Sequence, residues 1–297
     1  MPLKQKRITE KSALAMCKTI MTDAAETSPA NPLISIVTVS FNNLDGLNRT
    51  IRSVADQTFR DYELIVVDGG STDGTRELLD RLRPLVHQAV SEPDKGIYDA
   101  MNKGVRMARG EWIIFMNAGD LFADDTVLAA SSSVLREGNA GIVYGDSILR
   151  YADGAERYRP AATQSRLPYG MICSHQAIFS RRKLNIAHPF TVAPVLSAPA
   201  CDFDFLVTVY KAGEQFCKLD QAIARVEAGG ISDLKRQAVL RHYVRVLKRH
   251  DLLNAQLGLF YAYHQARTVM VKLARACLPI RVLYAGRQLR YGKSIQH

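Results

Sequence analysis

The sequence predicts an α/β protein with an open, Rossmann-like sheet, flanked by helices and followed by a helical C-terminal extension. Two observations predict this fold. Short apolar, β-branched runs alternate with segments whose apolar residues have helical spacing, as in folds built on a mostly parallel sheet. The 297-residue chain is also 47% hydrophobic, which is enough for one large core or two modest ones.

The first half of the chain shows the alternation most clearly. Residues 33–40 are apolar on both faces, as expected for a parallel strand covered on both sides. Apolar residues at helical spacing follow from Leu44 to Val54, and a second buried strand is expected at 62–68, which completes a β-α-β unit. The pattern then continues with a helix around Leu78, a strand at 87–91, a helix at 97–108 and a strand at 112–116.

The pattern changes from Gly141 onward, where we expect mixed or antiparallel strands. These strands are predicted at 142–146 and 174–179, followed by a helix at 202–212 and a short strand at 216–219. We expect the α/β domain to end at Gly229–Ser232. The predicted organisation is a flexible or helical lead at 1–32, the α/β domain at 33–232 and a basic amphipathic helical tail at 233–297.

The net charge of +10 is concentrated in the tail. Residues 233–297 hold 13 Lys and Arg against only Asp233 and Asp251. Two interpretations remain open: the tail attaches to an anionic membrane surface, or its helices pack on the α/β domain with solvated charges. Nucleic acid is a weaker partner, because the aromatic residues of the tail lie in its apolar run and not among its arginines.

Targeting and redox features favour a cytoplasmic protein, peripheral at most to the inner face of the cell membrane. The five cysteines are odd in number and widely scattered, so they predict neither a disulfide framework nor a zinc site. The apolar run after the basic N-terminus is too short for a signal peptide, and the stretch from Leu252 to Ala266 is too short and polar to span a bilayer.

Polar residues follow three predicted strands at the points where ligands bind in open α/β sheets. These segments are Ser40–Asn42, Asp68–Gly70 and Asn117–Asp120. Together they suit a nucleotide diphosphate, with a hard dication between the phosphates and Asp120. The chain has no phosphate loop and no Gly-x-Gly-x-x-Gly turn after its first strand, so a nucleoside triphosphatase or dinucleotide dehydrogenase is poorly supported.

Four motifs in this order resemble family 2 glycosyltransferases, and most resemble the branch that builds bacterial exopolysaccharides such as colanic acid. The motifs lie at 35–42, 66–75, 91–104 and 117–120, within a resemblance that covers roughly 33–232. The resemblance implies a GT-A fold with an open mixed sheet, a UDP- or GDP-sugar donor, a Mg²⁺ or Mn²⁺ ion and inversion at the anomeric carbon. The acceptor is expected to be a growing, lipid-linked exopolysaccharide or cell-surface glycan.

The resemblance also assigns roles to individual positions. The positions that match donor-binding residues are Val39, Ser40, Asn42, Asp68, Asp94, Lys95, Asn102 and Asn117. Asp120 is expected to bind the metal, although the family's usual Asp-x-Asp is here Asn117-x-Gly119 with its single carboxylate one position later. His175 and Gln176 match a pair that contacts donor phosphate or acceptor.

An inverting transfer needs a general base on the acceptor hydroxyl. Asp202 matches the family aspartate that opens a helix and acts as this base. Asp204 is the rival, and two residues further along a helix its side chain points elsewhere. Both carboxylates also fit a simpler role, which is to stabilise the dipole at the start of the helix.

Two other classes of function remain as alternatives. A sugar nucleotidyltransferase would have a similar α/β architecture, but it needs a glycine- and basic-rich phosphate loop after the first strand. Phe41–Leu44 is not such a loop. A non-catalytic membrane-associated scaffold would not need Asp68, Asp120 and Asp202.

Overall fold

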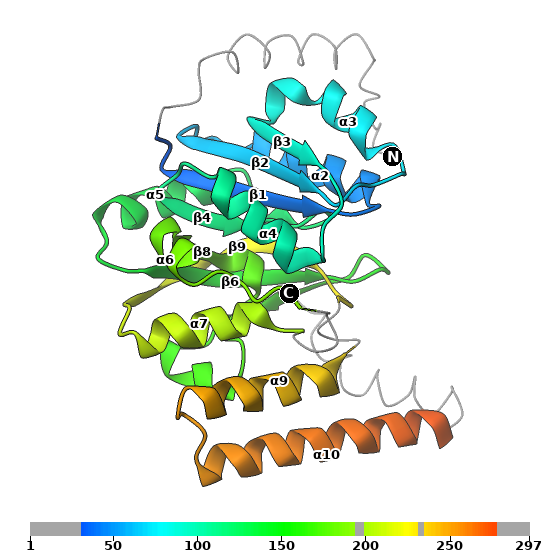
Figure 1. Ribbon diagram of the computed structural model, residues 1–297, viewed down its shortest axis with the longest axis vertical. Coiled ribbons are helices and arrows are strands. Elements are labelled where there is room, and N and C mark those ends of the chain that lie inside the picture. The colour runs from blue at the N-terminus through cyan, green and yellow to red at the C-terminus, as the bar shows by residue number, and fades with distance from the viewer. Residues whose placement is uncertain (1–30, 194–198, 231–234, 278–297) are drawn as a thin grey trace, which may run out of the picture.

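The computed structural model describes residues 31–193, 199–230 and 235–277. The predicted lead is therefore almost entirely outside the described residues, as are residues 231–232 of the predicted domain end and residues 233–234 and 278–297 of the tail. Within the described part, a mixed sheet of nine strands has the order β3-β2-β1-β4-β8-β6-β9-β5, with β7 paired to β6. Figure 1 shows helices on both sides of this sheet.

The first half is a parallel sheet, as predicted. Its strands are β1 (Ile34–Ser40), β2 (Tyr62–Asp68), β3 (Gln88–Ser91) and β4 (Trp112–Phe115), and all three pairings among them are parallel. The helices are α2 (Leu44–Ala55), α3 (Thr75–Arg81) and α4 (Ile97–Met107), with a short 3₁₀ turn η1 (Arg83–Leu85). The predicted strand and helix positions agree with these bounds to within one or two residues.

The second half has the expected antiparallel pairings, but some element boundaries differ. The strands are β5 (Leu121–Phe122), β6 (Ile142–Arg150), β7 (Glu156–Arg159), β8 (Ile178–Arg181) and β9 (Phe216–Glu227). The helical elements are α5 (Val127–Glu137), η2 (Gln164–Tyr169), η3 (His175–Ala177), α6 (Arg182–Ala187) and α7 (Cys201–Lys211). The strand predicted at 174–179 starts only at Ile178, because a 3₁₀ turn precedes it, and β9 runs eight residues beyond its predicted end at 219.

The sheet separates two hydrophobic cores because successive side chains of each strand point to opposite faces. Ile34 and Ile36 of β1 belong to the core under α2, α3 and α5, whereas Val37 and Val39 belong to the core under α4 and α7. Gly104 lets α4 approach β1 closely, since a Cβ there would lie 2.3 Å from Val37 Cγ1.

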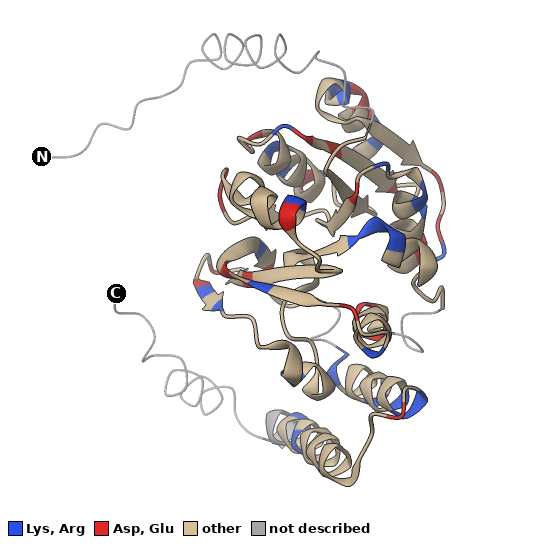
Figure 2. Ribbon diagram, turned by 90° about the vertical axis from the view of Figure 1, so that its left-hand side faces the viewer, with Lys and Arg blue, Asp and Glu red and all other residues tan. Residues whose placement is uncertain are grey.

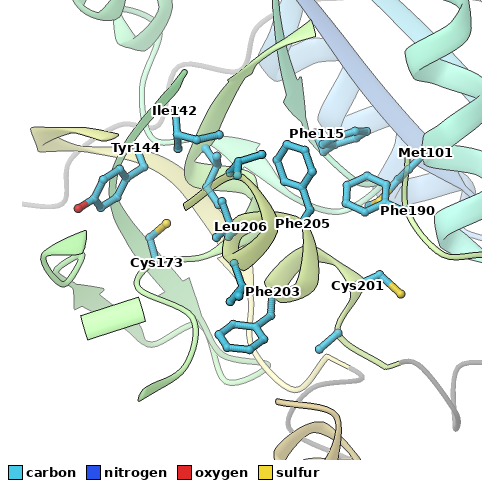
Figure 3. Packing of buried hydrophobic residues seen from close by; sticks show 14 of the residues in the cluster. Met101, Phe115, Ile142, Tyr144, Cys173, Phe190, Cys201, Phe203, Phe205 and Leu206 are labelled. Atoms are coloured by element: carbon cyan, nitrogen blue, oxygen red, sulfur yellow. The ribbon is translucent and has the colours of Figure 1, made fainter. Parts of the chain in front are cut away.

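The helix α7 contributes much of the second core. Its Phe203, Phe205 and Leu206 are buried, and Figure 3 shows them with Phe115 and Phe190 of the neighbouring segments. This packing fixes the start of α7, and so fixes the position of the carboxylates in its first turn.

Two C-terminal helices complete the described structure: α9 (Arg236–Arg249) and α10 (Ala255–Cys277). α9 shares the core of α7, with Val239, Leu240 and Leu247 buried. α10 packs on α9 through Leu257 and Tyr261, farther from the sheet (Figure 1). Among the described residues, no helix is long and apolar enough to cross a bilayer.

Candidate active site

A cavity of about 550 Å³ is lined by both halves of the sheet and by the two C-terminal helices. Five of the residues predicted for the site line it: Asn117, Asp120, His175, Gln176 and Asp202. They come from three separate places in the sequence, namely the segment after β4, the turn η3 and the first turn of α7. The fold therefore brings the predicted metal, phosphate and base residues to one space.

Asp120 is held firmly on one wall of the cavity. Its side chain is largely buried, at 7% exposure, and one carboxylate oxygen accepts from Gln176 Nε2 at 2.7 Å. The other oxygen accepts from the backbone N–H of Glu227 at 3.2 Å. The turn before it needs a glycine, because Gly119 has φ 107° and donates its N–H to Thr50 Oγ1.

Burial raises the pKa of the Asp120 carboxyl to about 6, against hydrogen bonds from Glu227 and Gln176 that lower it. The Glu227 carboxylate adds to the rise, and Arg49 and Arg150 form ion pairs with that carboxylate at 2.8 and 3.0 Å. A cation beside Asp120 would offset this cost of holding a buried negative charge.

The residues at this wall fit a hard dication only in part. Asp120 offers carboxylate oxygens, and Asn117 Oδ1 is buried with no hydrogen-bond partner in the described structure. Oxygen ligands of this kind are those that Mg²⁺ and Mn²⁺ prefer. Among the described residues, no group of three or more His, Cys, Asp or Glu could hold a metal. A metal here would therefore take most of its ligands from a bound diphosphate and water.

Asp202 lies at the start of α7 and is contacted from the opposite half of the molecule. Tyr98 of α4 donates its hydroxyl to Asp202 Oδ1 at 3.3 Å and accepts from the backbone N–H of Cys201 at 3.1 Å. Burial, with a further contribution from Asp202, raises the pKa of Tyr98 well above its ordinary value. The phenol therefore stays protonated and remains a donor to the carboxylate.

Asp204, the rival of Asp202, points to a different neighbour. Its carboxylate accepts a hydrogen bond and forms an ion pair with Arg249 of α9, and it lies 3.7 Å from His250 Nε2. It does not line the cavity that Asp202 lines. The two carboxylates are separated by the helical geometry that the sequence predicted.

The neighbouring residues His175 and Gln176 contact different parts of the site. Gln176 bonds Asp120, as described above, whereas the His175 ring packs against Phe115 and Phe190 with centroid distances of 5.1 and 5.9 Å. Burial lowers the pKa of His175, despite the opposing effect of the Asp202 charge. The ring is therefore neutral at pH 7 where it faces the cavity.

A second group of predicted donor residues gathers at the ends of β1 and β2, outside the lining of the cavity. Asp68 is fully buried and accepts from Ser71 N–H and Oγ and from Ser91 Oγ. Asn42, with a left-handed φ of 48°, accepts from Thr72 N–H. Asp94 lies beside Gly69, since a Cβ built on Gly69 would lie 2.6 Å from Asp94 Oδ2.

The remaining predicted donor residues differ in their accessibility. Val39 and Ser40 are buried in β1, and Ser40 Oγ has no partner within the described residues. Lys95 is exposed next to Asp94. Asn102 is buried, and its side-chain amide exchanges two hydrogen bonds with the backbone of Phe190, so its contacts join α4 to the second half.

Several cavity residues were not identified from the sequence. Tyr98 lies within the motif at 91–104, and this motif is the signal in the sequence that could have identified it. Glu227 was missed because β9 was predicted to end at 219. Arg236 of α9 and Phe260 of α10 line the cavity although both belong to the predicted tail.

Comparison with known proteins adds a family and a set of relatives. The family described as "Glycosyl transferase family 2" matches residues 35–194. A Mycobacterium tuberculosis protein named "PGL/p-HBAD biosynthesis glycosyltransferase" is 36% identical over 162 residues, which are 52% of this chain and 61% of that protein. The Bacillus subtilis "Putative teichuronic acid biosynthesis glycosyltransferase TuaG" is 35% identical over 97 residues, 32% of this chain and 38% of that protein. The chain thus spans less than two thirds of these relatives.

Solved structures share the fold at low sequence identity. Staphylococcus aureus TarS 1–349 in complex with UDP matches with a TM-score of 0.60 at 19% identity, over 84% of this chain and 76% of that one. The Pyrobaculum calidifontis mannosyltransferase PcManGT, in complex with GDP-Man and Mn²⁺, matches with a TM-score of 0.61 at 15% identity, over 94% of this chain and 88% of that one.

Proposed function

Because the chain belongs to glycosyl transferase family 2, has the GT-A fold and is a glycosyltransferase, we propose that it transfers a sugar with inversion from a UDP- or GDP-sugar. The observation that carries this proposal is the shared cavity. Asp120, proposed for the metal and diphosphate, and Asp202, proposed as the base, line one space, whereas Asp204 pairs with Arg249 outside it.

The proposed transfer step moves one proton and releases one leaving group. The acceptor oxygen attacks the anomeric carbon while its proton passes to a carboxylate oxygen of Asp202. The bond between that carbon and the diphosphate oxygen breaks, and the nucleoside diphosphate leaves on the opposite face. Tyr98 orients the Asp202 carboxylate through its hydrogen bond, so the base does not rotate away from the acceptor.

Asp120 and Asn117 would hold a Mg²⁺ or Mn²⁺ ion together with the donor diphosphate. When bound, such an ion neutralises the charge that develops on the leaving diphosphate. Gln176 keeps the Asp120 carboxylate in place by its hydrogen bond. His175, neutral and facing the cavity, would donate to the donor phosphate, or would donate to or accept from a hydroxyl of the acceptor.

We assign the nucleoside to the second group of residues, at the ends of β1 and β2. Asp68 and Asn42 frame the position for the base, and Asp94 and Lys95 the position for ribose and diphosphate. Val39 and Ser40 supply the backbone that lines it. We assign Asn102 a positioning role and no direct donor contact. Its side-chain amide bonds the backbone of Phe190 and so holds α4 in place.

For the pathway, we propose a growing, lipid-linked cell-surface glycan or exopolysaccharide as acceptor. The names of the relatives support this choice, since they refer to a PGL and to teichuronic acid biosynthesis. We further propose that the enzyme works peripherally at the inner face of the cell membrane. Basic residues and exposed apolar side chains of α10 support this location.

The test has two parts. A thermal-shift panel of UDP- and GDP-sugars with and without Mn²⁺ should show stabilisation by one nucleotide class, larger with metal. With that donor, Asp202→Asn should retain nucleotide binding but lose about 10²- to 10⁴-fold in turnover.

Asp204→Asn is the matched control, because Asp204 lies two residues after Asp202 in the first turn of the same helix. It should keep its turnover while losing thermal stability, because the ion pair with Arg249 is lost. Normal turnover by Asp202→Asn would disprove the base assignment, and a complete lack of response to nucleotides would disprove the donor class.

A further inference from the structure

One wall of the cavity is built from aromatic side chains of η2 and of α10, and α10 lies outside the family match. Three half-buried rings line it: Tyr169 at the end of η2, and Phe260 and His264 on α10. Phe260 lies 5.1 Å from Tyr169 and 4.3 Å from His264, measured between ring centroids. We call these three residues the ring wall.

The ring wall is held rigidly to the catalytic body. Tyr261, next to Phe260, is buried and donates its hydroxyl to the backbone oxygen of Pro168 at 2.9 Å. Tyr261 also contacts Tyr243 of α9, and Tyr243 packs at 4.0 Å against Phe203 of α7. Since Phe203 follows Asp202 in the chain, a continuous line of packed rings connects the ring wall to the proposed base.

Asp202 lines the same cavity as the donor-side residues and the ring wall. Its charge acts on Tyr98 of α4, on His175 of η3 and on Tyr243 of α9, so its carboxylate lies near groups from both sides of the cavity. The acceptor hydroxyl must meet this base from the side opposite the leaving diphosphate. The acceptor therefore belongs on the side of the cavity where the ring wall lies.

The chemistry of the ring wall points to a sugar ring as its ligand. Aromatic faces bind flat, apolar surfaces, and a pyranose presents such a surface through its C–H bonds while its hydroxyls remain at the edge. Polar groups stand where those hydroxyls would lie. His264 is kept neutral at pH 7, because burial and Arg236 lower its pKa, and can donate or accept, and Arg236 lines the same part of the cavity.

We propose that Tyr169, Phe260 and His264 form the acceptor subsite, and that it binds a pyranose ring of the acceptor glycan by stacking. This inference rests on the proposed glycosyltransferase reaction and names the chemical class recognised at its second substrate position. It also gives α10 a role in substrate recognition, in addition to any role at a membrane.

The test uses the full chain and measures two binding events separately. Calorimetry with UDP or GDP and Mn²⁺ reports the donor site. Saturation-transfer NMR with a panel of methyl hexopyranosides, which carry no aromatic group, reports the ring wall in the protein with and without nucleotide. The variants are Phe260→Leu and Tyr169→Leu, which keep apolar volume but remove the ring.

Leu259→Ala is the control, because Leu259 lies on the same helix but is 74% exposed and does not line the cavity. We expect at least one pyranoside to receive saturation at its C–H protons and to bind about five- to tenfold more weakly to each ring variant. The control should match the wild-type protein, and nucleotide affinity should be unchanged in all variants.

Three results would overturn the subsite: equal pyranoside binding by the ring variants, loss of nucleotide affinity in them, or no pyranoside binding by a wild-type protein that binds nucleotide. Failure of the proposed function looks different. A wild-type protein that binds pyranosides at the ring wall but no nucleotide would disprove the donor chemistry and leave the subsite standing. Binding of neither ligand would disprove both.

Discussion

The hydroxyl of Tyr98 joins two parts of the chain that are more than 100 residues apart in sequence. It accepts from the first turn of α7 and donates to the carboxylate in that turn. A phenol whose pKa is raised by burial cannot serve as a base near neutral pH, so its contribution is to hold Asp202. This makes Tyr98 a positioning residue.

Tyr98→Phe should therefore reduce kcat without changing donor affinity. One hydrogen bond to a charged group is lost, and because it is long we expect the lower end of the usual range, about a tenfold reduction. The measurement is kcat and donor KM, with nucleotide affinity by calorimetry. A rise in donor KM with kcat unchanged would show that Tyr98 binds donor instead.

At the scale of elements, the contact between α4 and β1 depends on one glycine. Gly104→Ala adds a Cβ that would lie 2.3 Å from Val37 Cγ1, and both residues are in a densely packed core. The change should destabilise the fold by about 1–3 kcal/mol, although alanine favours helix more than glycine does. Chemical denaturation measures this difference.

Gly258→Ala in α10 serves as the control for the glycine at 104. A Cβ there meets nothing within 4 Å, so only the gain in helix propensity remains, up to about 1 kcal/mol. Equal effects of the two substitutions would contradict the close contact between α4 and β1.

The start of α7 is also tied to α9 by a histidine. His242 Nδ1 accepts from the backbone N–H of Ala200 at 3.2 Å, which requires a ring nitrogen without a proton. Burial, and then the charges of Arg245 and Arg249, lower the pKa of His242, against the opposing effects of Asp204 and Asp202. The folded state therefore resists protonation that the unfolded state accepts.

The sign of this effect predicts lower stability in acid. The contribution of His242 is fully present above its unfolded pKa of about 6.5 and is lost as the pH falls below that value. Burial also lowers the pKa values of His87 and His250. Asp120 acts in the opposite direction, because its raised pKa of about 6 favours the folded state in acid. The histidines together outweigh this one carboxyl, so the wild-type Tm should fall between pH 7.5 and 5.5. His242→Asn, which keeps an acceptor near Nδ1 but does not titrate, should show a shallower fall. Identical slopes would contradict the role of His242.

The sequence predicted those elements whose own residues carry a strong signal. β1, β2 and β4 were predicted because apolar runs such as 33–40 are buried on both faces. β9 was predicted too short, since its residues after Leu219 include Asp220 and Gln221 and show no clear alternation. Its full length depends on pairing with β6, which is a tertiary contact.

The candidate site was predictable to the same extent. Strand-end position and family resemblance selected Asp120, Gln176 and Asp202, which do line one cavity. The contact between Tyr98 and Asp202 depends on how α4 is placed against α7, and no local pattern encodes that placement. The same holds for Phe260, which reaches the cavity only because α10 folds back along α9.

At the scale of the whole molecule, α9 and α10 differ in how much apolar surface they bury. α9 is part of the core, but α10 exposes a strip on the side opposite its buried Tyr261. The strip consists of Leu259, Tyr263, Met270 and Leu273, with exposures of 74%, 64%, 68% and 60%. α10 contains Arg267, Lys272 and Arg275 and no acidic residue, and Figure 2 shows Lys and Arg on both C-terminal helices.

This arrangement predicts binding to anionic bilayers through the strip, with about 1 kcal/mol from Arg267, the basic residue that helical spacing places beside the strip. Removal of the chain from residue 233 is a poor test, because it deletes α9 and exposes the core under Val239 and Leu240. Serine at Leu259, Tyr263, Met270 and Leu273 leaves that core intact. In liposome flotation, the wild-type protein should float with vesicles rich in phosphatidylglycerol, less so at high salt, and the serine variant should remain at the bottom. Phe260→Leu, which alters the cavity side of the same helix, should float like the wild type, and equal flotation of the serine variant would show that α10 does not bind membrane.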